Sequence, residues 1–382
     1  MKAWREWVRF DRNELSGSFG DFGTDFPLIV GMILVAGLDT TSALVMFGAM
    51  QILTGLAYGL PMPVQPLKAM AVIVITQRLS GDVLFGGGLA IGVLMLLLSV
   101  SGLLGGLARL VPKSVVRGVQ LGLGMQLALL ALGDYVRADG LAGYALAALS
   151  FALTIFLLGN RRVPPALVII PLGIAYGLLT RLDAGQLAGG VGLALPRLHI
   201  PRAEDVLTGL VVLALPQLPL SLANSVLATQ QVIADYFPDR KVGVRKIGFT
   251  YALMNLINPF LSGIPTCHGS GGMAGHYTFG GRTGGSVILE GSFYVALGLF
   301  LSRGFQVAIE LFPKPVLGVI LFFEAVALMT LVRDVVPERR DFMLVLLVGL
   351  LCAGLPYGYV VGLVIGTTLA YLFRRRPTTP EE

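Results

Sequence analysis

The chain has 382 residues, of which 55% are hydrophobic and only 13% charged, and its mean hydropathy is +0.80. Soluble domains carry about a quarter charged residues, so this composition excludes an ordinary soluble domain and predicts an integral membrane protein. The net charge of +6 does not indicate nucleic-acid binding, because the basic residues lie between hydrophobic spans and form no stripe on a soluble domain. The two cysteines, Cys267 and Cys352, imply no disulfide framework.

Residues 1–18 are expected to form a cytoplasmic segment at the membrane surface. In residues 1–12, Trp4, Trp7 and Phe10 alternate with basic side chains, and the stretch lacks the apolar region and cleavage site of a signal peptide. This pattern predicts a retained interfacial helix.

Long uncharged stretches then recur, and each reaches the roughly 17 to 25 apolar residues that cross a bilayer. They cover residues 41–60, 83–107, 141–159, 163–180, 206–234 and 342–373. Lipid cannot satisfy backbone N–H and C=O groups, and strand-like alternation is absent, so we expect these stretches to be helices.

Glycine and proline divide the chain into fourteen segments, seven before about residue 190 and seven after about residue 203. The third (66–77) and the tenth (269–280) are too short to span, and each follows a Gly-X-Pro sequence, at 59–61 and 263–265. Interrupted segments at matching places in two halves indicate a transport site. An odd-numbered repeat inverts its second copy. The prediction is therefore an all-α polytopic membrane protein, built as a seven-plus-seven inverted repeat.

The basic residues predict the orientation. If the N-terminus is cytoplasmic, twenty of the 28 Lys and Arg residues lie on the cytoplasmic side and seven on the other, with Lys68 inside the membrane. This asymmetry fits the positive-inside rule. Both termini are predicted to be cytoplasmic.

The first candidate site is the sequence Pro-Met-Pro-Val-Gln-Pro-Leu-Lys at 61–68, where the prolines prevent a continuous helix. A helix starting there has free N–H groups and about half a positive charge at its N-terminus, which suits an anion. Gln65, Leu67 and Lys68 are the candidate ligands. A lysine at this depth costs roughly 2.5–3.5 kcal/mol unless it meets a cavity or partner; the alternative is a lysine that extends to the interface.

The second candidate is Pro-Thr-Cys-His-Gly-Ser-Gly-Gly at 265–272. Its small residues allow backbone N–H groups to approach an anion, and Gly269 and Ser270 are candidate ligands. His268 either binds substrate or satisfies a neighbouring carbonyl. Adjacent Cys and His residues provide neither a catalytic pair nor a metal site, so no enzyme activity and no metal is expected.

Polar residues in two further segments are expected to complete or support the pocket. Asp21 and Thr24 lie at the polar entry to the first span. Asp25 shares a helix face with Asp21; one of the two either caps the helix or pairs with Lys68 or another buried base, and Asp25 is expected to be the cap. In the eighth segment, Gln217, Ser221 and Asn224 recur at spacings of four and three and share one face, which either lines a substrate cavity or joins helices.

Glu290 and Glu324 lie inside the eleventh and twelfth segments. Intramembrane carboxylates are usually proton relays or ion-pair partners. Both are candidates for coupling transport to protons.

The sequence resembles the molybdate transporter family, a relative of the sulfate permeases. The resemblance rests on Phe-Gly-Asp-Phe-Gly-Thr-Asp-Phe-Pro-Leu at 19–28, on the two candidate segments and on the stretches 218–225 and 280–285. It implies a first repeat over 19–190, with core 19–110 and gate 111–190, and a second over 191–373, with core 204–303 and gate 313–373. A short cytoplasmic tail, 374–382, follows. It also implies a substrate between the N-termini of half-helices 3 and 10.

We therefore predict a secondary transporter of a tetrahedral oxyanion, with molybdate as the first choice, in the plasma membrane. No cofactor and no nucleic-acid partner is expected; a coupling proton, membrane lipid and a homodimer are the other partners considered. The alternatives are a sulfate or general oxyanion carrier, an anion channel, and a nucleobase permease of the same fold.

Overall fold

The computed structural model describes residues 7–158, 165–181 and 191–375. Most of the predicted N-terminal helix and the tail from residue 376 lie outside them. Within them, six helical segments are long and apolar enough to cross a membrane, and five shorter apolar helices accompany them. The predicted all-α polytopic fold is confirmed; the inverted relation of its halves stays a prediction.

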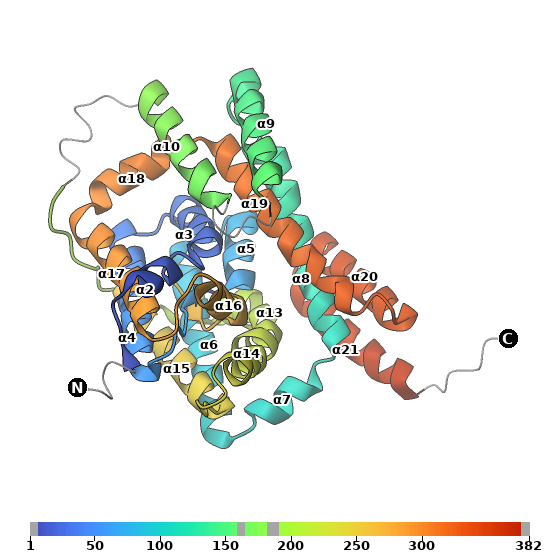
Figure 1. Cartoon of the computed structure of the whole chain (residues 1–382). Coiled ribbons are helices and arrows are strands. Elements are labelled where there is room, and N and C mark those ends of the chain that lie inside the picture. The colour runs from blue at the N-terminus through green and yellow to red at the C-terminus, as the bar shows by residue number, and fades with distance from the viewer. Residues whose placement is uncertain (1–6, 159–164, 182–190, 376–382) are drawn as a thin grey trace.

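Most helices pack into one group, which we call the core bundle (Figure 1). Helix α4 packs on α17, α6 on α12 and α15, and α5 on α3. Its elements are α2 (Arg12–Gly17), α3 (Phe22–Ala36), α4 (Thr40–Tyr58), β1 (Gln65–Pro66), α5 (Lys68–Gln77), α6 (Gly81–Ser101), α12 (Ala203–Gly209), η2 (Leu210–Ala214), α13 (Leu215–Leu220), η3 (Ser221–Ala228), α14 (Thr229–Tyr236), α15 (Val244–Ile257), η4 (Asn258–Leu261), β2 (Thr266–Cys267), α16 (Ser270–Thr278), α17 (Gly285–Phe300) and α18 (Ser302–Leu311).

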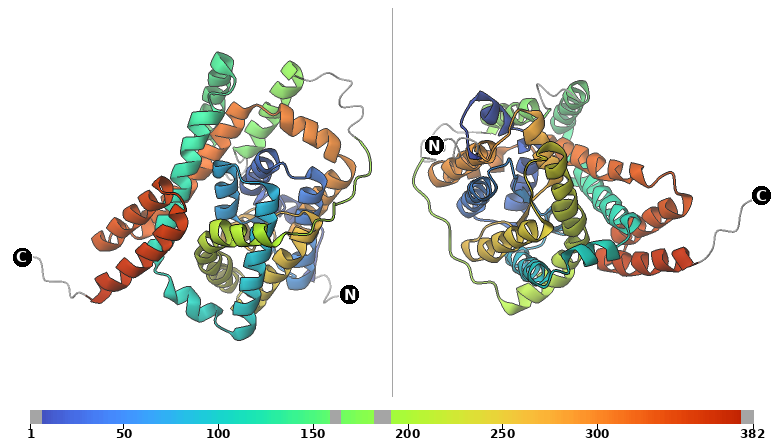
Figure 2. Two further views of the ribbon diagram at one scale, coloured as in Figure 1. Left: turned by 180° about the vertical axis from the view of Figure 1, so that it is seen from behind. Right: turned by 60° about the horizontal axis from the view of Figure 1, so that its bottom comes forward.

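A second group, the gate bundle, stands beside the core bundle and is reached through α7 (Leu104–Leu110) (Figure 2). Helix α8 packs on α19, α20 and α21, and approaches α20 closely where Gly118 faces Val348. The bundle comprises α8 (Lys113–Leu130), η1 (Ala131–Tyr135), α9 (Gly140–Leu157), α10 (Ala166–Arg181), α19 (Lys314–Thr330), η5 (Leu331–Asp334), α20 (Arg339–Gly354) and α21 (Gly358–Arg375).

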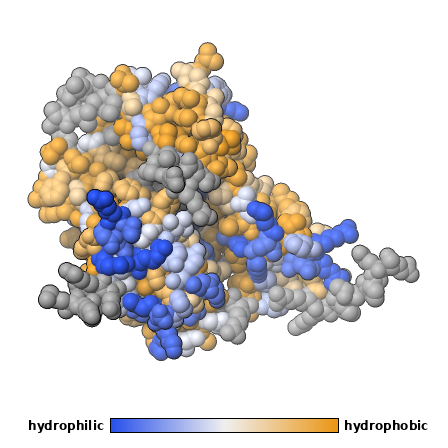
Figure 3. All heavy atoms as spheres, in the orientation of Figure 1, coloured by the Kyte–Doolittle hydropathy of each residue, from blue (hydrophilic) through white to orange (hydrophobic). Residues whose placement is uncertain are grey.

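The outer surface matches a lipid environment. Large apolar side chains are open to the surroundings, among them Leu141 at 88% and Phe156 at 85% exposure. In Figure 3 apolar residues cover most of the upper half, whereas hydrophilic residues gather in the lower half. A polar rim beside a broad apolar surface is typical of a protein embedded in a bilayer.

Helix α2 fastens the N-terminal segment to the core bundle. The fully buried Glu14 accepts backbone N–H bonds from Arg282, Thr283 and Ser286 at 3.0–3.1 Å. Burial raises the pKa of Glu14, and these donors lower it only in part. Trp7 donates to the Leu56 carbonyl. The part of the predicted interfacial segment that the structure describes, from residue 7 on, therefore packs against the core bundle.

Candidate substrate site

The two predicted half-helices are present and meet inside the core bundle. Helices α5 and α16 begin directly after the two-residue strands β1 and β2, which pair antiparallel with Gln65 opposite Cys267. The short pairing joins the two chain breaks, so the starts of both helices lie close together. Sequence analysis placed both helices correctly but missed the strands, because two residues give no alternating pattern.

Side chains from the preceding helices satisfy the irregular backbone at these breaks. In the first half, Gln51 exchanges two hydrogen bonds with Val64, at 2.9 and 3.1 Å. In the second half, Asn255 does the same with Thr266, at 2.6 and 3.0 Å. Non-helical backbone at membrane depth requires such partners. Gln51 and Asn255 thus play matching parts in the two halves, which sequence analysis did not identify.

The polar stripe of the eighth segment faces the half-helices. The side-chain oxygen of Gln217 accepts the backbone N–H of Ala69 at 2.9 Å, so Gln217 caps the N-terminus of α5. Its amide donates to Ser221 at 3.1 Å, and Ser221 hydrogen-bonds Tyr251 at 2.7 Å. These hydrogen bonds through Ser221 and Tyr251 hold the Gln217 amide in its capping position. Gln217 lies on α13, and the π-helical turns of η3 carry Ser221 and Asn224.

The N-terminus of α16 is built differently. Its N-cap residue, Gly269, makes no side-chain capping bond, and the first bond inside the helix runs from Met273 to Gly269. The hydroxyl of Ser270 donates to Asn224 at 2.8 Å, which orients this turn without capping it. The N–H groups of residues 270–272 are therefore the donors that an anion would meet.

Asp21 and Gln65 lie where the two helix starts meet. The Gln65 amide donates to both carboxylate oxygens of Asp21, at 2.8 and 2.7 Å. A Cβ at Gly269 would overlap the Gln65 amide oxygen, and one at Gly272 would overlap Asp21. Both glycines are thus required by close contact.

Lys68 reaches across to the gate bundle. Its ammonium lies 3.4 Å from the Glu324 carboxylate on α19, and the side chains are 26% and 11% exposed. The alternative of an interfacial lysine does not hold, because the ion pair is largely buried. Glu324, proposed from sequence as a proton carrier, is thereby the counter-ion of Lys68 and links the two bundles.

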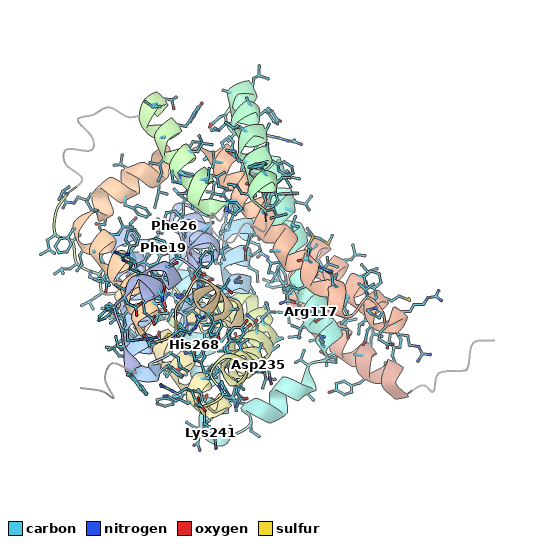
Figure 4. All side chains as sticks on the ribbon, viewed as in Figure 1. Phe19, Phe26, Arg117, Asp235, Lys241 and His268 are labelled. Carbon is cyan, nitrogen blue, oxygen red and sulfur yellow. The ribbon has the colours of Figure 1, made fainter. Side chains whose placement is uncertain are left out.

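His268 is fully buried in the core bundle (Figure 4). Its Nδ1 lies 3.1 Å from the Pro63 carbonyl and must donate to it, so Nε2 accepts from the Thr250 hydroxyl at 2.8 Å. Both nitrogens are occupied, which favours the structural alternative that the sequence left open. We therefore leave His268 out of the proposed anion contacts.

The remaining predicted residues at the first span are placed as follows. Asp21 precedes α3, and Asp25 lies one turn inside it, fully buried. The expectation that Asp25 caps the helix is wrong, because neither carboxylate oxygen has a hydrogen-bond partner among the described residues. Leu67 is buried and precedes α5, with its N–H on the Pro265 carbonyl. The side chain of Thr24 lies outside the described part.

Glu290 is paired with a histidine that sequence analysis did not identify. Its carboxylate lies 3.2 Å from Nε2 of His276 on α16, without hydrogen-bond geometry, and both side chains are buried. His276 lies on α16 and Glu290 on α17, so the pair forms only when these two segments of the chain fold together.

A cavity of about 430 Å³ lies between the bundles at the far end of α5. Arg78 and Lys314 line it, and Arg78 forms an ion pair of 2.8 Å with Asp134 of the gate bundle. Cys267 is buried, so its thiol is not available as a nucleophile. The described residues contain no cluster of His, Cys, Asp and Glu that could hold a metal ion.

Comparison with solved structures identifies the fold. The transmembrane domain of a cyanobacterium bicarbonate transporter, BicA, matches with a TM-score of 0.69 at 16% identity, over 95% of this chain and 98% of that chain. The murine SLC26A9 anion transporter in the inward-facing state matches with a TM-score of 0.73 at 14% identity, over 98% and 71% of the respective chains.

Comparison of sequences identifies the family. Residues 13–127 and 209–328, more than half of the chain, match the family described as molybdate transporter of MFS superfamily. Molybdate transporter 1 of Arabidopsis thaliana is 30% identical over 93% of this chain and 87% of its own length, and Molybdate transporter 1 of Chlamydomonas reinhardtii is 27% identical over 97% and 94%. The resemblance seen in the sequence is therefore confirmed, and the chain belongs to the molybdate transporter family of anion-transporting membrane proteins.

Proposed function

We propose that this protein is a secondary transporter that carries molybdate across the plasma membrane by alternating access. The observation that carries the proposal is the meeting of two half-helix N-termini beside Lys68 in the middle of the core bundle. The relatives named as molybdate transporters support the choice of anion. An enzyme activity is not proposed, and both ring nitrogens of His268 are engaged by Pro63 and Thr250.

The donors at this place suit a tetrahedral dianion. The N–H groups of residues 270–272 start helix α16 and carry partial positive charge, and Lys68 supplies a full positive charge. The amides of Gln65 and Gln217 and the Ser270 hydroxyl, which hydrogen-bond Asp21, Ser221 and Asn224, support the pocket around these donors. Four oxygens in a tetrahedron can meet donors from several directions at once. A planar nucleobase accepts hydrogen bonds only near its ring plane and carries no charge of −2, which makes a nucleobase permease the weaker alternative.

The movement is proposed to separate the core bundle from the gate bundle. Among the described residues, two ion pairs join them, Lys68 with Glu324 at the site and Arg78 with Asp134 at the far end of α5. A movement that separates the bundles must break both pairs. A transporter that must break contacts in each cycle saturates, whereas a channel does not.

The orientation remains part of the proposal. Several contacts join segments whose basic residues the positive-inside count places on the cytoplasmic side. Arg240 lies over the Trp7 ring, and Lys113 and Arg117 pair with Asp334, which directly follows Arg333. Arg78 and Lys314, assigned to the opposite side, share the cavity described above. This agreement supports cytoplasmic termini.

Uptake of labelled molybdate into proteoliposomes tests the proposed function. We expect saturable uptake that unlabelled tungstate blocks and sulfate affects weakly, because the family resemblance favours molybdate over sulfate. Equal competition by sulfate would make the protein a general oxyanion carrier. Uptake that does not saturate would indicate a channel, and competition by uracil without molybdate uptake would indicate a nucleobase permease.

A further inference from the structure

A carboxylic acid without a partner lies directly behind the anion site. Asp25 is fully buried in α3, and neither of its carboxylate oxygens has a hydrogen-bond partner among the described residues. It stands one helical turn after Asp21, whose backbone carbonyl accepts the Asp25 N–H at 3.2 Å. Asp21 in turn holds Gln65 between the two helix starts.

The charges around Asp25 are mostly acidic. Four ionisable groups lie around it, and three of them, Asp21, Glu290 and Glu324, are acidic. The fourth, Lys68, is already paired with Glu324. Two further titratable groups near Asp25, Cys267 and Tyr294, are neutral. A buried carboxylate with neither a donor nor a counter-ion of its own takes up a proton instead.

The two carboxylates proposed from sequence as proton carriers differ from Asp25. Glu290 lies beside His276, and Glu324 beside Lys68, each within ion-pair distance. A basic partner stabilises the charged carboxylate and reduces its need for a proton. Asp25 has no such partner of its own.

We propose that Asp25 is the proton-binding site of this transporter, and that its proton is carried together with the anion. This inference rests on the proposed function and names its coupling ion. A dianion at the helix starts brings two further negative charges near Asp25 and therefore favours the neutral acid. By linkage, the neutral acid favours the anion to the same degree. Loss of the proton, once the site opens to water, then weakens anion binding and promotes release.

The variant Asp25→Asn imitates the neutral acid and gives the sharpest test. Molybdate affinity of the unaltered protein is expected to fall as pH rises from 6 to 9, approaching about tenfold per pH unit once Asp25 ionises in the free protein. Asp25→Asn is expected to bind with a pH-independent affinity equal to that of the unaltered protein at low pH. Calorimetry on the purified proteins measures both. The control is Asp82→Asn, which removes an exposed carboxylate at the start of α6.

Transport separates this inference from the proposed function. In proteoliposomes an imposed pH gradient, acidic outside, is expected to drive molybdate accumulation by the unaltered protein and by Asp82→Asn. Asp25→Asn should exchange molybdate for molybdate without accumulating it. Accumulation by Asp25→Asn at the unaltered level would overturn the proton site and leave molybdate transport intact. Absence of molybdate transport in the unaltered protein would overturn the function itself.

Two further measurements exclude misfolding and a different carrier. Infrared difference spectra between low and high pH should contain the carbonyl band of a protonated carboxylic acid, and Asp25→Asn should lack it. If Asp25→Asn is not monodisperse in detergent, the same band lost in Asp25→Ser decides the assignment. A band that persists in both variants but disappears in Glu290→Gln would assign the proton to Glu290 and contradict the inference.

Discussion

Replacing Gly272 by alanine is expected to abolish molybdate binding, whereas replacing its neighbour Gly271 is expected to leave binding intact. A Cβ at Gly272 would overlap the Asp21 carboxylate and lie 2.9 Å from the Gln65 amide nitrogen, so it must separate that pair. A Cβ at Gly271 meets nothing within 4 Å. We expect at least a tenfold loss of affinity for Gly272→Ala in calorimetry, with no measurable uptake.

The two substitutions form a matched pair. Both exchange glycine for alanine in the first turn of α16, where alanine favours the helix by roughly 0.5–1 kcal/mol. Gly271→Ala should therefore raise the thermal unfolding temperature slightly. Equal molybdate affinity in the two variants would show that the contact between Gly272 and Asp21 does not shape the site.

Replacing Lys68 by alanine is expected to reduce molybdate affinity about 10- to 100-fold. Hydrogen bonds to charged groups contribute roughly 1.5–3 kcal/mol, and each 1.4 kcal/mol changes affinity tenfold. The variant also leaves Glu324 without its counter-ion at 11% exposure, so it is expected to unfold at a lower temperature. Lys68→Arg, which keeps the charge, should retain part of the affinity.

The double variant Lys68→Ala with Glu324→Gln separates binding from stability. Removal of both charges should restore much of the thermal stability, because no unpaired carboxylate remains. Molybdate affinity should stay low, since the cation is still missing. Full affinity in the double variant would remove Lys68 from the anion site and leave it a purely structural link between the bundles.

The positions of the half-helices could be predicted because proline and glycine act locally. The prolines at 61–66 and the glycines at 269–272 determine where backbone helices break, whatever packs around them. Spacing likewise predicted that Gln217, Ser221 and Asn224 share one face, since helical periodicity depends on sequence alone.

The partners of these residues could not be predicted, because they arise from contacts between distant segments. Lys68 and Glu324 are 256 positions apart, and His276 on α16 meets Glu290 on α17 only in the folded core bundle. The role of Asp25 was misjudged for the same reason. Its place near a helix start suggested capping, but the helix begins at Phe22 and turns the carboxylate into the core.

The location of the bound anion tests the central claim most directly. Crystals of the purified protein grown with molybdate, measured at the molybdenum absorption edge, give an anomalous difference peak wherever the metal atom is ordered. We predict a peak between the Lys68 ammonium and the backbone N–H groups of residues 270–272. A peak in the cavity of Arg78 and Lys314, with none between the helix starts, would contradict the proposed site.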